Sequence, residues 1–456
     1  METIKKTLNA FSNALRIEDL RKKILFTLGI LVLYRVGGHI TVPGIDPQRL
    51  ASFFAHNKDN LFGLYDSFTG GAFAKATIFA LGIMPYISAS IAIQLLGSVV
   101  PTIQMLQKEG AEGRAKLNQW TRYFTVVLAI IQSWGIAVWL SSIRINYAGM
   151  QGVSVLLDSF ASGDGWGNFG FKVLTTLTMT TGTIFIMYMG EQITARGVGN
   201  GISLIIFAGI VSNLPRAIIH EFEQFRAGNN PLMTEVIIIA VVLAIVTFIV
   251  FMEQATRRIP LQSPRRVVGR KVMGAQSSYL PFKVNTAGVI PVIFASSIMF
   301  IPAMIGSWIP NISWVQSFAI AFLPGHISYS IIFALLIIFF TYFYTAIQYN
   351  PNDIADNLKK SGGFIPGIRP GRKTAEYIDH ILTRITLPGA IFLALISVVP
   401  LHLKEYLNMS FYLGGTSVLI VVGVALDTLR QIESQLHTKN YDGFLKHGRL
   451  RGRNAS

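Results

Sequence analysis

Ten apolar stretches, each long enough to cross a membrane, constrain the fold of this chain more than any other feature. A helix that spans a bilayer needs roughly 20 predominantly apolar residues. The first stretch, Ile24 to Val42, contains only Arg35 as a charged residue, and the others contain none. The longest uncharged run, Val284 to Asn352, has room for two spans joined by a hairpin at Pro310, Pro324 and Gly325. The sequence therefore predicts an all-α integral membrane protein with ten transmembrane helices.

The distribution of basic residues predicts the orientation of these spans. Lys and Arg accumulate in cytoplasmic loops. If the N-terminus is cytoplasmic, 30 of the 39 Lys and Arg residues fall on the cytoplasmic side and eight on the other. We therefore expect both termini in the cytoplasm. No signal peptide is apparent before the first span, so we expect that span to be retained. The chain has no cysteine, which excludes disulfides and thiolate sites.

An even division of the spans suggests two halves. Five spans precede about residue 220 and five follow it, a count that is compatible with an inverted repeat. We expect an N-terminal half over residues 1–220 and a C-terminal half over residues 221–456, with a short cytoplasmic tail from about residue 428.

Two cytoplasmic loops, at about residues 254–283 and 350–380, are longer and more basic than a connection between helices requires. One interpretation is that they enforce topology and touch anionic lipid. The other is that they dock an acidic partner or ribosomal RNA. The candidate docking residues are Arg257, Arg258, Arg265, Arg266, Arg270, Lys271, Arg369 and Arg372.

The sequence carries no recognisable catalytic motif. The stretch GIRPGRKT, Gly367 to Thr374, has Arg372 where a phosphate-binding loop needs its second glycine. No His-Glu-x-x-His pattern occurs, and spans two to ten contain no ionisable group of the kind that couples transport to ions. Arg35 lies near the outer end of its span, where we expect it to snorkel to the interface. We expect no enzyme activity and no cofactor.

Polar and helix-disrupting residues mark the second and seventh spans. Pro85, with Ser88 and Gln94 further along the second span, favours a helix that faces a cavity. The seventh span opens with Asn285 and Pro291. Before the second span, Leu61 to Ala74 is too short to cross the membrane and too apolar for a free loop, so we expect it at the interface or re-entering the membrane inside the protein.

Several long motifs resemble the SecY/Sec61-alpha family of protein-conducting channel subunits. The stretches that carry the resemblance are VPGID at 42, FTGGAFAKATIFALGIMPYISAS from 68, KEGAEGRAKLNQWTRY from 108, GEQITARGVGNGISLIIFAGI from 190, KVNTAGVIPVIFASS from 283, NPNDIADNLKKSGGFIPGIRPG from 350 and FYLGGTSVLIVVGVALD from 411. They cover nearly the whole chain. Similar apolar composition alone does not produce matching polar loops.

The resemblance implies a clamshell of two pseudo-symmetric halves around an hourglass pore, with a lateral gate between the second and seventh spans. The implied pore ring is Ile83, Ile87, Ile202, Ile206, Ile293 and Ile420. The implied plug is the segment 61–74, with Leu61, Phe62, Leu64, Tyr65, Phe68, Gly70 and Gly71. The implied gate residues are Pro85, Ser88, Gln94, Asn285 and Pro291.

The resemblance also implies a function and partners. Such a channel, in the bacterial plasma membrane, passes unfolded preproteins that carry signal sequences and releases membrane segments sideways into lipid. Its implied partners are SecE, SecG, the motor SecA and the ribosome, besides anionic lipids. Two other hypotheses remain open from the residues alone: a small-solute carrier, which the missing intramembrane charges disfavour, and an RNA-binding membrane anchor, which the placement of the basic residues disfavours.

Overall fold

The computed structural model describes residues 17–56, 65–66, 68–147, 150–157, 160, 165–228, 231–262, 266–268, 271–273, 277–308, 321–322, 326–407 and 415–447. Its helices are α2 (Glu18–Gly37), α3 (Pro47–His56), α5 (Met84–Val99), α6 (Pro101–Lys108), α7 (Ala111–Ser142), α9 (Gly165–Arg196), α10 (Gly201–Arg226), α11 (Leu232–Gln254), α12 (Ile290–Trp308), α14 (Ile327–Gln348), α15 (Pro351–Ser361), α16 (Arg372–Leu407) and α17 (Gly415–His447). Its strands are β1 (Arg144–Tyr147), β2 (Met150–Ser154), β3 (Thr256–Gln262), β4 (Arg266–Val268), β5 (Lys271–Met273) and β6 (Ser277–Lys283).

A helix covers most of each of the ten predicted spans. Among the described residues, seven helices are long and apolar enough to cross a membrane, namely α7, α9, α10, α11, α14, α16 and α17. The pair α5 and α6, bent by 105°, would make an eighth. The remaining stretches are covered by α2, of 20 residues, and by α12, whose apolar part is shorter. The chain is therefore a multi-pass membrane protein, and the count of ten spans stays a prediction.

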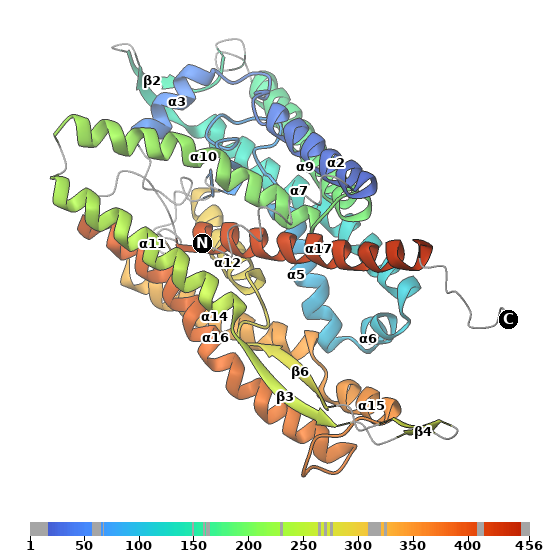
Figure 1. The fold of residues 1–456 in the computed structure, drawn as a ribbon. Helices are drawn as coiled ribbons and strands as arrows, with labels where there is room; N and C mark the ends of the chain where they lie inside the picture. The colour runs from blue at the N-terminus through green and yellow to red at the C-terminus, as the bar shows by residue number, and fades with distance from the viewer. Residues whose placement is uncertain are drawn as a thin grey trace.

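Helix packing follows the order of the chain (Figure 1). The helices α2, α5, α7, α9 and α10 pack mainly with one another, and α11, α12, α14, α16 and α17 do the same. The main contacts between these two groups are those of α12 with α5 and α7, and of α10 with α17. The groups are separated by residues 227–231, so the boundary expected at residue 220 lies inside α10.

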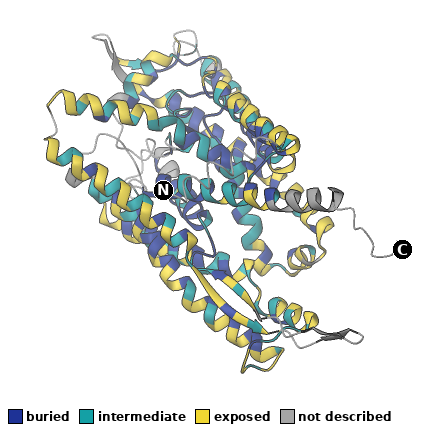
Figure 2. Ribbon diagram, viewed as in Figure 1, coloured by how far each residue is buried: buried dark blue, intermediate teal, exposed yellow. Residues whose placement is uncertain are grey.

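Burial is concentrated where the two groups of helices meet (Figure 2). Many large apolar side chains are exposed on the outside. One large cluster of buried apolar residues includes members from α5, α10, α12 and α17. On the outside, α11 is the most apolar of the seven spans and the least buried, with Met233 71% exposed and Leu243 61% exposed. An apolar surface of this extent matches a lipid environment.

The two basic segments form one folded unit, which we name the cytoplasmic body after the side of the membrane expected for it. β3 pairs with β6 as an antiparallel ribbon, and β4 pairs with β5. Two backbone hydrogen bonds of 2.9 Å join Gln262 of β3 to Phe364, which follows α15. A small core joins the ribbon to α16 and consists of Ile259, Phe282, Ile365, Ile378 and Leu382. The sequence predicted basic loops here, and the strands and α15 were not predicted.

The first and last described helices meet, at the start of α2 and in the second half of α17. Leu20 and Ile24 of α2, Val198, and Ile432 and Leu436 of α17 form a separate buried group, which we name the terminal cluster. The Val198 N–H donates to Thr27 Oγ1 over 3.0 Å. The Gly199 N–H donates to Gln431 Oε1 over 2.9 Å. The cluster therefore connects the two groups of helices.

Candidate pore, plug and gate

The six isoleucines of the expected pore ring all belong to one apolar cluster. Five are buried: Ile83, Ile87, Ile206, Ile293 and Ile420. The sixth, Ile202, is half-buried and packs against the same cluster.

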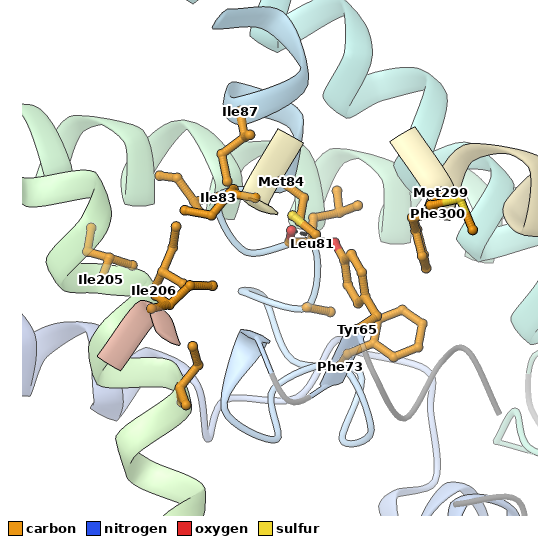
Figure 3. Packing of buried hydrophobic residues seen from close by; sticks show 14 of the residues in the cluster. Tyr65, Phe73, Leu81, Ile83, Met84, Ile87, Ile205, Ile206, Met299 and Phe300 are labelled. Atoms are coloured by element: carbon orange, nitrogen blue, oxygen red, sulfur yellow. Dashed lines mark hydrogen bonds between the residues drawn. The ribbon is translucent and has the colours of Figure 1, made fainter. Parts of the chain in front are cut away.

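Local structure explains how four helices supply these side chains. Ile83 is the N-cap of α5 and Ile87 lies one turn later, so both lie on one face of that helix. Ile202 and Ile206 are related in the same way on α10. Figure 3 shows Ile83 and Ile87 at the start of α5, with Ile205 and Ile206 on α10. A constriction lined by such side chains can exclude water and ions by dewetting.

Tyr65 is the first described residue of the expected plug segment, and it packs against aromatic rings. Its ring stacks on Phe300 of α12 with centroids 4.4 Å apart, and meets Phe73 edge to face at 4.9 Å (Figure 3). Its hydroxyl donates to the Leu81 carbonyl over 2.6 Å. Tyr65 is fully buried. The expected plug residues Leu61, Phe62 and Leu64 lie outside the described residues.

The other end of this segment lies against the backbone of α10. A Cβ built on Gly70 would lie 2.7 Å from the Gly209 carbonyl oxygen, and one on Gly209 would collide with the carbonyl of Phe68. Gly70 and Gly71 also have positive φ angles of 69° and 86°. Glycine is required here both for close approach and for backbone conformation.

Arg35 contacts the same segment, and its expected position at the membrane interface stays a prediction. Its Nη1 donates to the Gly70 carbonyl over 2.7 Å. The neighbouring Tyr34 hydroxyl donates to the Thr69 carbonyl over 3.4 Å. A buried carbonyl that accepts from a guanidinium gains a charge-assisted hydrogen bond, which is why the side chain turns inward.

Asp66 organises the turn that follows. Its Oδ1 accepts the Ala74 N–H over 2.8 Å and the Thr69 hydroxyl over 3.5 Å. Burial raises the pKa of the Asp66 carboxyl above its usual value, and the hydrogen bonds from Ala74, Phe73 and Thr69 oppose that shift. The turn is thus closed by the carboxyl group of a half-buried aspartate.

The two expected gate helices, α5 and α12, pack against each other, but their prolines do not weaken them. Pro85 lies in the first turn of α5, and Pro291 is the second residue of α12. The first turn of a helix lacks partners for its N–H groups, so a proline there removes no hydrogen bond. The proline inside α12 is Pro302.

The expected polar gate residues take separate partners. Gln94 Nε2 donates to Ser90 Oγ within α5, over 3.1 Å, and Ser88 is half-buried on the same helix. Asn285 Nδ2 donates instead to Glu253 Oε1 over 2.5 Å and to the Gly288 carbonyl over 3.2 Å. Glu253 lies at the end of α11 and is buried. The sequence indicated only that a span ends at this charge, and it did not predict the hydrogen bond with Asn285.

A contact across the seam between α5 and α12 was also missed. Ser297 Oγ of α12 lies 3.7 Å from Met84 Sδ of α5. The Ser297 hydroxyl also donates to the Ile293 carbonyl one turn earlier, over 2.8 Å. The motif IPVIFASS contains this serine, but its spacing alone gives no indication of a partner on another helix.

The expected docking residues lie on the surface of the cytoplasmic body wherever their side chains are described. Arg257 and Arg258 are exposed on β3, and Arg369 is exposed in the turn before α16. Arg372 is 92% exposed and pairs with Glu376 over 3.2 Å. Arg266 begins β4 and Lys271 begins β5. Arg265 and Arg270 lie outside the described residues.

An apolar groove of about 700 Å³ separates α10 from α11, with α17 as its floor. Its lining includes Ile218 and Phe222 of α10, Val236 and Ile239 of α11, and Val421 of α17. Among the residues that the structure describes, no three His, Asp or Glu side chains are grouped to hold a metal ion.

Comparison with known proteins identifies the family. The SecY family model matches residues 77–429. The protein translocase subunit SecY of Pseudomonas aeruginosa is 46% identical over 98% of this chain and 97% of its own. The same subunit from Streptomyces scabiei is 47% identical, over 96% of this chain and 100% of its own.

Solved structures show the same fold at low sequence identity. One, described as "The structure of a protein conducting channel", has a TM-score of 0.65 and 17% identity, and the match covers 92% of this chain and 94% of the other. Another, Sec61 in a canine ribosome-channel complex, has a TM-score of 0.60 and 17% identity, with the same coverage. Since the family model and full-length relatives agree with this fold, the chain belongs to the SecY family of protein translocase subunits.

Proposed function

We propose that this chain is the pore-forming subunit of a protein translocation channel, which passes unfolded secretory polypeptides across the bacterial plasma membrane. The observation that carries this proposal is the cluster of six isoleucines from α5, α10, α12 and α17, adjoined by the segment that contains Tyr65. Branched apolar side chains exclude ions while offering a polypeptide no strong binding group. The family consists of translocase subunits and not of catalytic enzymes.

The segment 61–74 is the proposed plug. The burial of Tyr65 and its stacking on Phe300 support a resting position on the apolar cluster. A related structure of similar fold is described as showing that the plug domain of SecY stabilises the closed state and maintains a membrane seal. Deleting the segment here should leave transport possible while raising the ion conductance of the idle channel.

The seam between α5 and α12 is the proposed lateral gate. Each is the second helix of its own group, and they meet through apolar contacts and the pair Ser297 and Met84. Separating them breaks no ion pair among the described residues. A signal sequence or membrane segment would leave through this seam into lipid.

In this proposal, a partner protein supplies the energy for transport. The exposed arginines of the cytoplasmic body would dock SecA or the ribosome, with Arg369 as the principal contact, and anionic lipid would lie nearby. Structural neighbours include an idle yeast Ssh1 complex bound to the 80S ribosome, with a TM-score of 0.55 and 17% identity, which supports ribosome docking. Both termini would then be cytoplasmic.

SecE is the proposed occupant of the groove between α10 and α11. The groove lies on the side where the two groups of helices join, and its exposed apolar side chains fit a partner helix in the membrane. SecG would be a further small companion. Replacing Ile239 by Arg should reduce co-purification of SecE, whereas the same change at the exposed Ile331 of α14 should not.

A photo-crosslinker tests the central proposal. We would place it at Ile87 or Ile293 and ask whether an arrested secretory chain is captured in membranes that contain SecE and SecA. The matched controls are Leu96 and Ile301, which lie on the same two helices but are 46% and 41% exposed. Capture at the isoleucines alone is the expected result. Equal capture at the controls, or none at any position, would contradict the proposal and favour a small-solute carrier.

A further inference from the structure

We propose that Asp427 and Arg430 of α17 are positioning residues for the docked partner. They hold the base of the β3–β6 ribbon, residues 253–256 and 283–285, and so fix the angle at which the cytoplasmic body presents its exposed arginines. This inference rests on the proposed function, because it concerns a partner that docks on the body.

The ribbon joins the membrane helices through two short links. α11 ends at Gln254 and β3 begins at Thr256, while β6 ends at Lys283. Next to the strand pairs, the Val284 N–H donates to the Ala255 carbonyl over 2.9 Å. A ribbon of two strands is at best marginally stable by itself, so contacts with neighbouring elements must set its direction.

Side chains of α17 contact both links, and we name these contacts the clasp. Arg430 Nη2 donates to the backbone carbonyl of Glu253 over 2.9 Å, and Arg430 Nη1 lies 3.5 Å from Asp427 Oδ1. The same Asp427 oxygen lies 3.7 Å from Lys283 Nζ. Carbonyls in the last turn of a helix lack partners within the helix, so a guanidinium is a suitable donor at the end of α11.

The base also contacts α16, by packing instead of charge. A Cβ built on Gly389 of α16 would lie 2.7 Å from the Val284 carbonyl oxygen. Further along the ribbon, Ile259 and Phe282 pack on Ile378 of the same helix. Loss of the clasp would therefore leave the ribbon attached to α16 but free to tilt.

α17 is a suitable support because neighbouring residues fix it to the first group of helices. Gln431, next to Arg430, accepts the Gly199 N–H, and Ile432 belongs to the terminal cluster. Loss of the clasp should therefore move the ribbon and not α17.

The candidate docking residues lie where a tilt of the ribbon would displace them. Arg257 and Arg258 directly follow Thr256 and are exposed. At the other end of β3, Gln262 is bonded to Phe364, so a tilt would also carry the segment that leads to Arg369.

The clasp can be removed with little effect on folding. The side chains of Lys283, Asp427 and Arg430 are 42%, 59% and 35% exposed, and ion pairs as accessible as these contribute little to stability. Arg430→Met removes the guanidinium, and Arg430→Lys retains a cation. Asp427→Asn removes the carboxylate between the two cations and is a second way to open the clasp. The control is Glu433→Met, which removes an exposed charge from the same helix.

The first readout is the position of the ribbon in idle channels, purified with their partners in proteoliposomes. The chain contains no cysteine, so Tyr279→Cys on β6 and Lys116→Cys on α7, both exposed, provide two sites for nitroxide spin labels. The distribution of distances between the labels should broaden in Arg430→Met and Asp427→Asn, but not in Arg430→Lys or Glu433→Met. No broadening in the first two variants, or equal broadening in Arg430→Lys, would overturn the proposal.

The second readout is SecA-driven transport in inverted vesicles. Arg430→Met should lower the maximal rate roughly twofold to fivefold, the range expected for the loss of a partly exposed ion pair. The SecA concentration that gives half the maximal rate should not change, because the exposed arginines remain. A higher half-maximal concentration with an unchanged maximal rate would make Arg430 a docking contact and overturn the positioning role, as would unchanged transport.

The two readouts separate this inference from the proposed function. The label distances are measured without SecA and without a secretory chain. A chain that fails the crosslinking experiment but shows the expected broadening would contradict the proposed function and leave the clasp established.

Discussion

The cytoplasmic body and the plug segment hold their proposed functional residues in opposite ways. In the cytoplasmic body, a small apolar core fixes the ribbon and α16, and the arginines project outward with few partners. In the plug segment, the proposed functional residues are themselves the buried contacts, as Tyr65 and Gly70 show. Substitutions on the body should therefore separate docking from folding, while substitutions around the plug should change both stability and sealing.

Charge reversal at Arg369 should have the largest effect. Arg369 is exposed, and its backbone carbonyl accepts a hydrogen bond from the Thr374 hydroxyl over 3.0 Å. Because a substitution leaves the backbone carbonyl in place, Arg369→Glu should leave the fold intact. We expect SecA-driven transport in inverted vesicles to fall by at least about tenfold, as for a lost interfacial charge contact. The control is Lys116→Glu, an exposed reversal on α7. Near-normal transport in Arg369→Glu would remove this residue from the docking surface.

The core of the body offers a converse test. Phe282 is buried and Tyr279, on the same strand, is 60% exposed. Phe282→Ala should cost about 3–5 kcal/mol of local stability, because it opens a cavity between β6 and α16. Limited proteolysis of the ribbon should accelerate strongly, while Tyr279→Ala should behave like the unchanged protein. Equal protease sensitivity of the two variants would show that the body is not held by its core.

A polar side chain at the constriction should affect sealing more than folding. Ile87→Ser removes a buried apolar group from the proposed ring and should raise the ion conductance of idle channels several-fold, since dewetting depends on an apolar lining. Leu96→Ser, on the exposed part of the same helix, is the control. If both variants conduct like the unchanged protein, Ile87 does not contribute to the seal.

The smallest expected effect concerns pH. The raised pKa of the Asp66 carboxyl means that the bound position of the plug favours the protonated form. Stability of that position is therefore greatest at low pH and declines as pH rises from about 3.9, the usual value for Asp, through the raised value. The mobility of a label at residue 68 should increase over this range in the unchanged protein and stay flat in Asp66→Asn. A pH response that persists in Asp66→Asn would assign it to another group.

The sequence was sufficient for features set by composition and local pattern. Spans follow from runs without charge. The six isoleucines were implied by the resemblance to the family, not by composition or periodicity, and the structure gathers them into one apolar cluster. Partners that are distant in sequence could not be predicted, as Arg35 and Gly70 show, because no periodicity links residues 35 positions apart. Helix starts were also missed: the effect of Pro85 depends on whether α5 begins at Thr77 or Met84, and tertiary packing decides this.

The terminal cluster links the fold to the timing of synthesis. Leu20 and Ile24 are made first, but Ile432 and Leu436 complete their burial only after about 400 further residues. At the usual 5–20 residues per second, the start of α2 waits roughly 20–80 s for its partner. A chain that stops before α17 leaves this apolar surface uncovered permanently. The contact between α2 and α17 therefore forms only in a chain that has been made past Leu436.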